Sequence, residues 1–175
     1  MRPLQSTDLK RLHREWRRRT DGRVGLLLDS VQTPFNVGAI IRSAAAWRVD
    51  DIWLVGATPT TGDSKVQKTA MGTDRYLSVH QSETAAEAVA SVAAAGYRLV
   101  AVELADGAEP LHEIDLTGSV CLAVGHEDRG VTGAVLDQAE AVGFIPQLGR
   151  VGSLNVATAA AVAVYEARRQ EWASP

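Results

Sequence analysis

Ser119-Val-Cys-Leu-Ala-Val-Gly-His-Glu-Asp-Arg-Gly130 joins an apolar run to a polar segment bounded by glycines. This pattern is typical of a buried strand that opens into a loop. Asn36-Val-Gly-Ala-Ile-Ile-Arg42 follows another apolar run, and Ile145-Pro-Gln-Leu-Gly149 follows a third and continues into Ser153-Leu-Asn155. Parallel sheets bind ligands at the carboxyl ends of their strands. We therefore expect the three segments to form one site.

Helical and extended patterns alternate along the rest of the chain. Apolar runs predict strands at 24–28, 51–55, 76–79, 97–102, 120–124 and 141–145. Helices are expected at 36–47, at 84–95 and from a cap at Ser153 or Asn155 through Arg168, with a loop and a short helix over 60–72. This alternation predicts an α/β fold with a single, mostly parallel sheet and helices on both faces.

A dinucleotide-binding fold is the main competitor for such a pattern. That fold requires G-x-G-x-x-G directly after its first strand. Here that place holds Asp29-Ser-Val-Gln-Thr-Pro-Phe-Asn-Val-Gly38. Because the glycine-rich phosphate cradle is missing, the sequence argues against a nicotinamide cofactor.

The three segments, in this order and spanning most of the chain, resemble the three motifs of the SpoU (TrmH-type) RNA ribose 2′-O-methyltransferases of the SPOUT superfamily. The resemblance implies methyl transfer from S-adenosylmethionine to an RNA ribose. It also implies that the C-terminal helix threads a preceding loop to form a trefoil knot, a topology that no sequence periodicity reveals and that is otherwise rare.

The resemblance also assigns residues to the cofactor. The loops after the fourth, fifth and sixth strands are expected to hold S-adenosylmethionine through backbone groups and an apolar wall. By position, the corresponding residues are Glu103, Leu104, Gly125, Ile145 and Leu154. Because backbone groups make the contacts, loop shape is expected to matter more than side-chain identity there. His126 departs from the family pattern, which has a small or polar residue at this position, and its role stays open.

The expected catalytic residues are Arg42, Asn36, Glu127, Ser153 and Asn155. The family assigns the central role to the arginine that matches Arg42, sometimes as the base. Free guanidinium stays protonated at ordinary pH, so we interpret Arg42 first as a group that orients RNA, with a proton path through phosphate or water as the alternative. Asn36 is expected to fix ribose or backbone, Glu127 to pair with an arginine, and Ser153 and Asn155 to complete a polar wall.

Each of these residues also has a purely structural interpretation. Taken alone, Asn36 is compatible with a helix cap, Arg42 with a helix surface and Glu127 with a solvated turn. Glycines such as Gly125 and Gly130 suit tight turns whether or not a ligand binds beside them. The joint match of three motifs favours the functional interpretation over these separate ones.

Composition limits the remaining classes. A chain of 175 residues suits one domain. Its one cysteine, Cys121, lies in an apolar run and is expected to be a core residue, and a reducing compartment follows because no disulfide is possible within one chain. We find no apolar leader, no stretch of about 20 apolar residues and no metal-ligand spacing. The expectation is a cytoplasmic protein without a membrane segment or a metal.

The charge of the chain is unevenly distributed. Residues 1–23 carry eight basic and three acidic residues, a net charge of +5, whereas the remainder carries −8. We therefore divide the chain into a basic helical arm (1–22) and a methyltransferase domain (23–172). Leu9, Leu12 and Trp16 recur at helical spacing, so one face of the arm is able to dock. Either the arm contacts a polyanion or it is a solvated surface helix.

The expected substrate is RNA, and tRNA is preferred because the chain has a short basic arm and no separate RNA-binding domain. The alternatives are ribosomal RNA and a non-catalytic RNA-binding protein that keeps the knotted fold. By the same resemblance the protein is expected to form a homodimer through the knot region. In that dimer Arg42 of one subunit reaches the cofactor pocket of the other, and Trp172 is a candidate interface residue.

Overall fold

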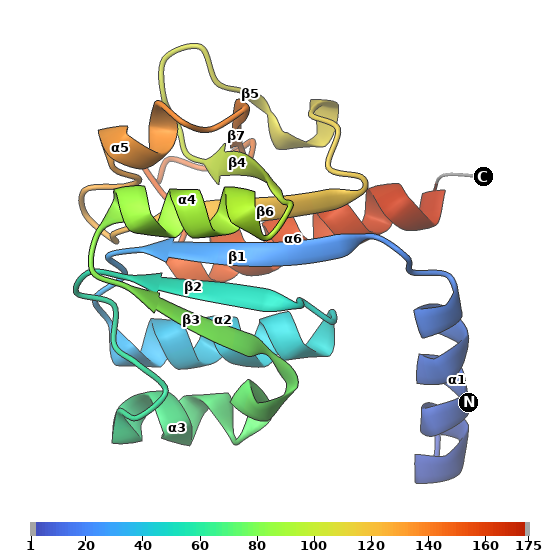
Figure 1. Ribbon diagram of the computed structural model, residues 1–175. Helices are drawn as coiled ribbons and strands as arrows, with labels where there is room; N and C mark the ends of the chain where they lie inside the picture. Colours follow the sequence, from blue (N-terminus) through green and yellow to red (C-terminus); the bar gives the residue numbers. More distant parts are fainter. Residues whose placement is uncertain (1–2, 174–175) are drawn as a thin grey trace.

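A computed structural model describes residues 3–173, so Arg2 of the expected arm lies outside the described residues. Seven strands form one sheet, and every strand pair is parallel. The strands are β1 (Arg23–Asp29), β2 (Asp51–Val55), β3 (Ser78–Ser82), β4 (Arg98–Val102), β5 (Glu109–Pro110), β6 (Ser119–Gly125) and β7 (Ala141–Phe144). Their order across the sheet is β3-β2-β1-β6-β4-β7-β5 (Figure 1). The predicted α/β class with a parallel sheet is confirmed.

Helices cover both faces of this sheet, as expected. They are α1 (Ser6–Arg18), α2 (Pro34–Ala46), α3 (Ser64–Ala70), α4 (Ala85–Ala94), α5 (Gly133–Leu136) and α6 (Val156–Ala173). Alternate residues of β1 point to opposite faces: Leu26 and Leu28 pack with α2, α3 and α6, whereas Leu27 packs with α4 and α5. Both layers of side chains exclude solvent, which explains why the strands read as continuous apolar runs.

Three elements differ from the sequence prediction. The strand expected at 76–79 begins later, because residues Thr73–Tyr76 form a 3₁₀ helix and the Ser78 N–H makes the first bond toward β2, to the Asp50 carbonyl (2.9 Å). The short β5 and α5 were not predicted, because each has too few residues to show a period. The last helix is capped by Asn155, whose Oδ1 accepts the N–H groups of Ala157 and Thr158. The knot stays a prediction.

Cys121 lies on β6 and is fully buried in the side-chain layer that faces α4 and α5. Burial raises the pKa of its thiol well above the usual value. Its predicted role as a core residue is confirmed. Among the described residues, no helix combines the length and the apolar character that crossing a bilayer requires.

The basic helix α1 lies beside the amino end of β1 and contacts the rest of the chain only near its C-terminal end (Figure 1). Trp16 packs on Trp172 of α6 with ring centroids 4.9 Å apart. Leu9 and Leu12 are exposed. The expected docking face is therefore used only at one end, and most of the helix surface faces solvent.

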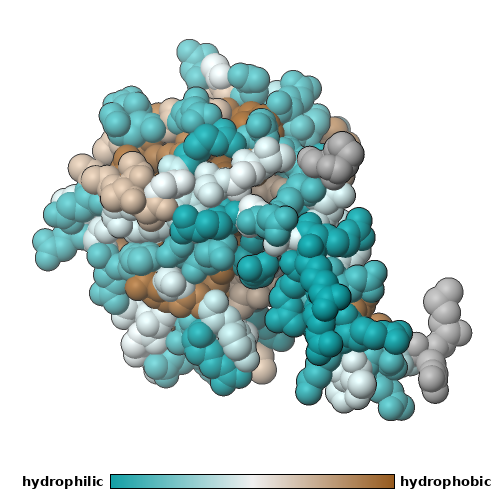
Figure 2. Space-filling view, turned by 45° about the vertical axis from the view of Figure 1, so that its right-hand side comes forward, coloured by the Kyte–Doolittle hydropathy of each residue, from teal (hydrophilic) through white to brown (hydrophobic). Residues whose placement is uncertain are grey.

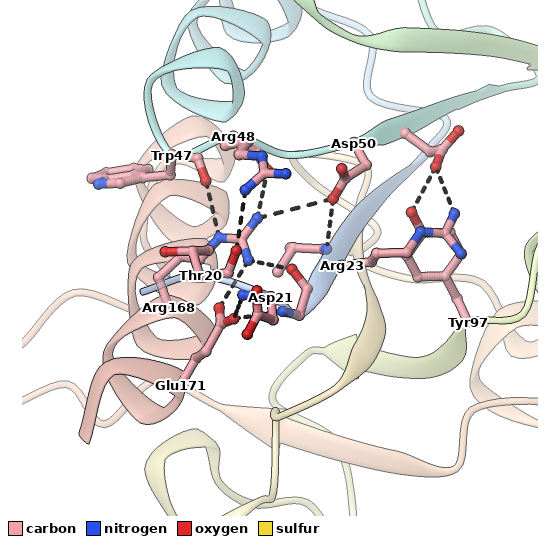
Figure 3. A network of polar contacts seen from close by, with 12 residues as sticks. Thr20, Asp21, Arg23, Trp47, Arg48, Asp50, Tyr97, Arg168 and Glu171 are labelled. Atoms are coloured by element: carbon pink, nitrogen blue, oxygen red, sulfur yellow. Dashed lines mark hydrogen bonds and ion pairs between the residues drawn. The ribbon is translucent and has the colours of Figure 1, made fainter. Parts of the chain in front are cut away.

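A buried arginine fastens the end of α6 to this region (Figure 3). The Arg168 side chain is 1% exposed. Its Nε donates to the carbonyl of Trp47 (3.0 Å), one terminal nitrogen donates to the carbonyl of Gly22 (2.7 Å) and the Glu171 carboxylate (3.0 Å), and the other donates to the carbonyl of Arg48. One guanidinium thus holds together the last helix, the start of β1 and the end of α2.

Replacement of Arg168 by Met is expected to destabilise the protein by about 3 kcal/mol, because it removes the donor to three buried carbonyls and to Oε2 of Glu171. Urea unfolding followed by circular dichroism measures this loss. Arg169→Met is the matched control, since Arg169 lies next in sequence, is 48% exposed and bonds only Glu166. Equal effects of the two substitutions would contradict the role given to Arg168.

Candidate active site

A cavity of about 360 Å³ lies at the carboxyl ends of β4, β6 and β7 and reaches the start of α6. All five residues expected to hold the cofactor line it, together with two of the expected catalytic residues: Glu103, Leu104, Gly125, Ile145 and Leu154, with Glu127 and Ser153. The sequence assigned no role in the site to several other lining residues, namely Asp128, Arg129, Phe144, Gln147 and Gly152. They lie within the quoted motifs or directly beside them, so that position was the available signal.

The loop after β6 is a tight turn that only glycine permits at its base. The N–H of His126 donates to the Gly130 carbonyl (3.0 Å), and the N–H of Gly130 donates to the His126 carbonyl (2.9 Å). A Cβ on Gly125 would lie 2.0 Å from the carbonyl carbon of Gly130. Gly125 therefore lets two stretches of backbone approach each other at the cavity wall.

Two carboxylates brace this loop from neighbouring strands. The Glu103 carboxylate accepts the N–H groups of Val131 and Leu104, each at 2.9 Å. Asp29, which is buried at the end of β1, accepts the N–H of Thr132 at 2.7 Å. Sequence reasoning gave Glu103 only a backbone role and did not select Asp29, although an acid at the end of an apolar strand was a usable signal. Both side chains fix the loop that forms the cavity.

Glu127 accepts three hydrogen bonds from the segment that begins α2. The N–H groups of Gln32 and Thr33 donate to its carboxylate at 3.0 Å each, and the Asn36 amide donates at 2.9 Å. Burial disfavours the charged form, but these donors outweigh it and lower the pKa of Glu127 to about 2. Within residues 3–173 the backbone before α2 and the Asn36 amide supply the donors to Glu127, and its pairing with an arginine stays a prediction.

Asn36 and Asn155 extend this contact to the third motif. The Asn155 side-chain amide donates to Oδ1 of Asn36 at 3.0 Å, while Oδ1 of Asn155 caps α6. The hydrogen bonds run in one direction along this chain of side chains: Asn155 donates to Asn36, and Asn36 donates to the Glu127 carboxylate. Asn36 is not the cap of α2, because Thr33 holds that position. The three motifs thus meet in one polar relay.

Arg42 lies apart from this relay and does not line the cavity of its own chain. Six residues separate it from Asn36 on α2, so it leaves the helix about 9 Å further along and from another side. Its guanidinium donates to the Met71 sulfur at 2.9 Å, next to the end of α3. The structure brings four of the five expected catalytic residues together within one chain and leaves the fifth outside.

His126 lines the cavity, and its Nδ1 accepts the N–H of Asp128 at 3.0 Å. This bond leaves Nε2 as the nitrogen that carries the proton in the neutral ring. No group of three or more histidine, cysteine, aspartate or glutamate side chains able to hold a metal ion occurs within residues 3–173.

Known proteins resemble the chain over most of its length. Residues 23–165 match the model of the SpoU rRNA Methylase family. The tRNA (guanosine(18)-2′-O)-methyltransferase of Escherichia coli K12 is 36% identical over 143 residues, which are 82% of this chain and 62% of that protein. The 23S rRNA (guanosine(2553)-2′-O)-methyltransferase RlmP of Bacillus subtilis is 35% identical over 143 residues, 82% of this chain and 57% of that protein.

A crystal structure of an AdoMet-bound rRNA methyltransferase from Sinorhizobium meliloti superimposes with a TM-score of 0.80 and 32% identity. The match covers 86% of this chain and 57% of that one. The chain therefore spans little more than half the length of several of the proteins that it matches.

Glu127→Gln is expected to destabilise the protein at neutral pH by about 1 kcal/mol, a value reduced for the solvent screening of a partly exposed carboxylate. The folded-state pKa is about 2 and the ordinary value is 4.5. The stabilisation by the carboxylate is therefore complete above about pH 4.5 and is lost as the pH falls toward 2. Urea unfolding of both proteins at about pH 7 and about pH 4 measures the difference, which shrinks at the lower pH. Glu109→Gln, an exposed carboxylate on β5, is the control and shows no such trend.

Gly125→Ala is expected to open the turn after β6 and weaken binding of S-adenosylhomocysteine on the order of tenfold or more, because the added Cβ meets backbone. Calorimetric titration measures the affinity. The matched control is Gly133→Ala at the start of α5, where nothing lies within 4 Å of the added carbon. Equal affinities for S-adenosylhomocysteine in the two variants would show that this turn does not contribute to the cofactor site.

Proposed function

The chain belongs to the SpoU rRNA methylase family, and on that premise we propose that it transfers a methyl group from S-adenosylmethionine to a ribose 2′-hydroxyl of RNA. The observation that carries the proposal is the cavity itself. Its wall contains residues of the second and third expected motifs, and the Glu127–Asn36–Asn155 relay joins the first motif to them.

The residues of the cavity fit the expected cofactor. Leu104, Ile145 and Leu154 give an apolar wall, and Gly125 allows the tight turn with Gly130 that shapes the cavity beside it. The volume of about 360 Å³ falls within the range of small-molecule sites. When bound, S-adenosylmethionine supplies an already activated methyl group, so the residues of the chain have to position the acceptor and manage one proton.

The acceptor side is served by Ser153, Asn36 and Asn155. Ser153 lines the cavity, and the two asparagines stand beside it at the start of α6 and α2. A carboxyl with a pKa of about 2 is too weak a base to accept the hydroxyl proton near neutral pH. Glu127 therefore serves as an ionised anchor that keeps the asparagine amides oriented toward the acceptor.

We assign Arg42 to the neighbouring subunit's cavity in a homodimer. The residue stands outside the cavity of its own chain. Apolar side chains lie exposed on α2 and α6, among them Phe35 and Val162, which suits an interface between two copies. From the partner's side, the protonated guanidinium orients an RNA phosphate and favours the 2′-oxyanion electrostatically.

The proposed substrate is tRNA, with ribosomal RNA as the alternative. The relatives named above include a tRNA enzyme and an rRNA enzyme of similar identity. The arginines of α1 give the chain a local grip on a polyanion despite its net charge of −3. A non-catalytic RNA-binding role is disfavoured by the intact relay and by the ionised Glu127 at its centre.

Purified protein mixed with labelled S-adenosylmethionine and either unfractionated tRNA or ribosomal RNA tests the function. We expect label in tRNA, with the methyl group mapped to a ribose 2′-oxygen by its resistance to alkaline cleavage. Label found only in ribosomal RNA would identify ribosomal RNA, and not tRNA, as the substrate. Failure of the folded protein to bind either S-adenosylmethionine or S-adenosylhomocysteine by calorimetry would remove the enzymatic proposal altogether.

Arg42→Ala is expected to lower turnover about a thousandfold while leaving cofactor affinity within a few-fold, because the residue faces the acceptor rather than the cofactor. Turnover of Arg42→Lys is expected to fall nearly as far, since an ammonium group cannot reproduce the planar pair of N–H donors of a guanidinium. Steady-state methylation and calorimetry measure the two effects. Full activity of Arg42→Ala would place the catalytic centre elsewhere.

Mixing two inactive variants tests whether Arg42 acts across the interface. A mixed dimer of Arg42→Ala and Gly125→Ala subunits contains one complete site only if the arginine enters the partner's cavity. Recovery of activity after the two are unfolded and refolded together is expected. Two Arg42→Ala subunits refolded in the same way are the control, and no recovery in the mixture would place Arg42 in its own subunit's site.

A further inference from the structure

A second hollow lies at the other end of the sheet, where α1 approaches the ends of α2 and α6. It has a volume of about 540 Å³. Trp16 and Trp172 line it from α1 and α6. Trp47 lines it from the end of α2, and Tyr76 from the 3₁₀ helix Thr73–Tyr76. We call this hollow the tryptophan groove. Three of the four tryptophans of the chain meet there.

The aromatic rings around the groove form a continuous series. Trp16 and Trp172 lie 4.9 Å apart, Trp172 and Tyr165 6.1 Å, and Tyr165 and Trp47 5.9 Å between centroids. The indole N–H of Trp172 donates to the Thr20 hydroxyl, which fixes the orientation of its ring. Trp16 is 39% exposed and is not enclosed by its neighbours. Rigid, partly exposed aromatic faces of this kind are suited to stacking with planar groups.

The helix α1, which forms one wall of the groove, carries arginines without carboxylate partners among the described residues, whereas Arg168 at the groove is paired with Glu171. Among residues 3–173, none of the five arginines of α1 and its C-cap forms an ion pair; these are Arg11, Arg14, Arg17, Arg18 and Arg19. Arg17 and Arg48 line the groove itself, and the Arg19 guanidinium lies 4.6 Å from the Trp16 ring centre. Figure 2, turned toward this side, shows hydrophilic side chains gathered over α1. By contrast, Arg23, Arg98 and Arg169 on the body each hold a carboxylate.

We propose that the tryptophan groove binds unpaired nucleobases of RNA by stacking, while the surrounding arginines contact the phosphates. The combination of aromatic faces with a positively charged surface is the one that recognises single-stranded nucleic acid without sequence preference. The inference rests on the proposed function in so far as RNA is the substrate, and it adds a second RNA contact outside the catalytic cavity.

The position of the groove defines what this contact does. The groove lies beside the residues that precede β1 and β2, whereas the cavity lies at the carboxyl ends of the strands. The seven residues of β1 separate the two sites by about 20 Å. An RNA that fills both sites therefore needs an unpaired nucleotide at that separation from the methylated ribose.

Quenching of tryptophan fluorescence tests the proposal, because a base stacked on an indole quenches its emission. The probes are a short oligoadenylate and a blunt-ended RNA duplex, both added with saturating S-adenosylhomocysteine to block the cavity. We expect quenching by the single strand and none by the duplex, whose bases are already stacked. Trp53 is fully buried and supplies the unquenched remainder of the signal.

Trp16→Leu and Trp47→Leu probe opposite walls of the groove. Binding to labelled oligoadenylate is expected to weaken about tenfold in each variant, and binding to labelled duplex to change less than about twofold. Leu9→Ala, an exposed apolar residue of α1 outside the groove, is the control and leaves both affinities unchanged. The Trp47→Leu variant keeps the carbonyl that Arg168 requires, so it is expected to fold even where Trp16→Leu releases the helix.

Three results would overturn the proposal: equal quenching by the duplex, unchanged oligoadenylate affinity in both tryptophan variants, or a loss of affinity that accompanies a lower mass in sedimentation. The last result would assign the surface to a second copy of the chain. Methyl transfer is measured separately. Selective quenching by an inactive wild-type protein would contradict the proposed function while supporting the groove.

Discussion

The buried guanidinium of Arg168 holds the end of α6 against the start of β1 and the end of α2, and the rest of the structure depends on this contact. An arginine cannot lose its charge inside a protein, so its burial requires acceptors on every side. The carbonyls of Gly22, Trp47 and Arg48 and the carboxylate of Glu171 supply them. Because α6 is 18 residues and about 27 Å long, fixing its last turns also limits where its first turn lies, beside the catalytic relay.

The catalytic end depends on carboxylates that accept backbone N–H groups. Loops at the ends of parallel strands carry donors that no ladder satisfies. Glu127 accepts such donors from the loop before α2, and Glu103 and Asp29 accept them from the loop after β6. Their negative charges are therefore committed to the shape of the cavity. In the proposed reaction, this arrangement leaves the acceptor hydroxyl to the asparagine amides, the Ser153 hydroxyl and Arg42 of a second subunit, which suits a methyl donor that is already activated.

Much of this was accessible from the sequence. The parallel sheet, the helices on both faces and the common edge for the three motifs follow from patterns a few residues long, since apolar runs specify strands and polar residues after them specify strand ends. Gly125 was selected by its position in the motif that resembles the SpoU family, and the structure shows that its turn brings the Gly130 backbone close. Where a pattern was too short, as at β5, or was displaced by a 3₁₀ turn, as before β3, the prediction was incomplete.

The sequence by itself thus determined the fold class and the uneven distribution of charge, because both are encoded by neighbours in the chain, and the resemblance of its motifs to the SpoU family indicated the cavity residues. Only the tertiary structure decided which groups meet through space. It gave Glu127 backbone donors, moved Arg42 out of its own cavity and gathered Trp16, Trp47 and Trp172 around one groove. These contacts join residues separated by many others in the chain, and they depend on strand order and helix direction, which local patterns do not contain.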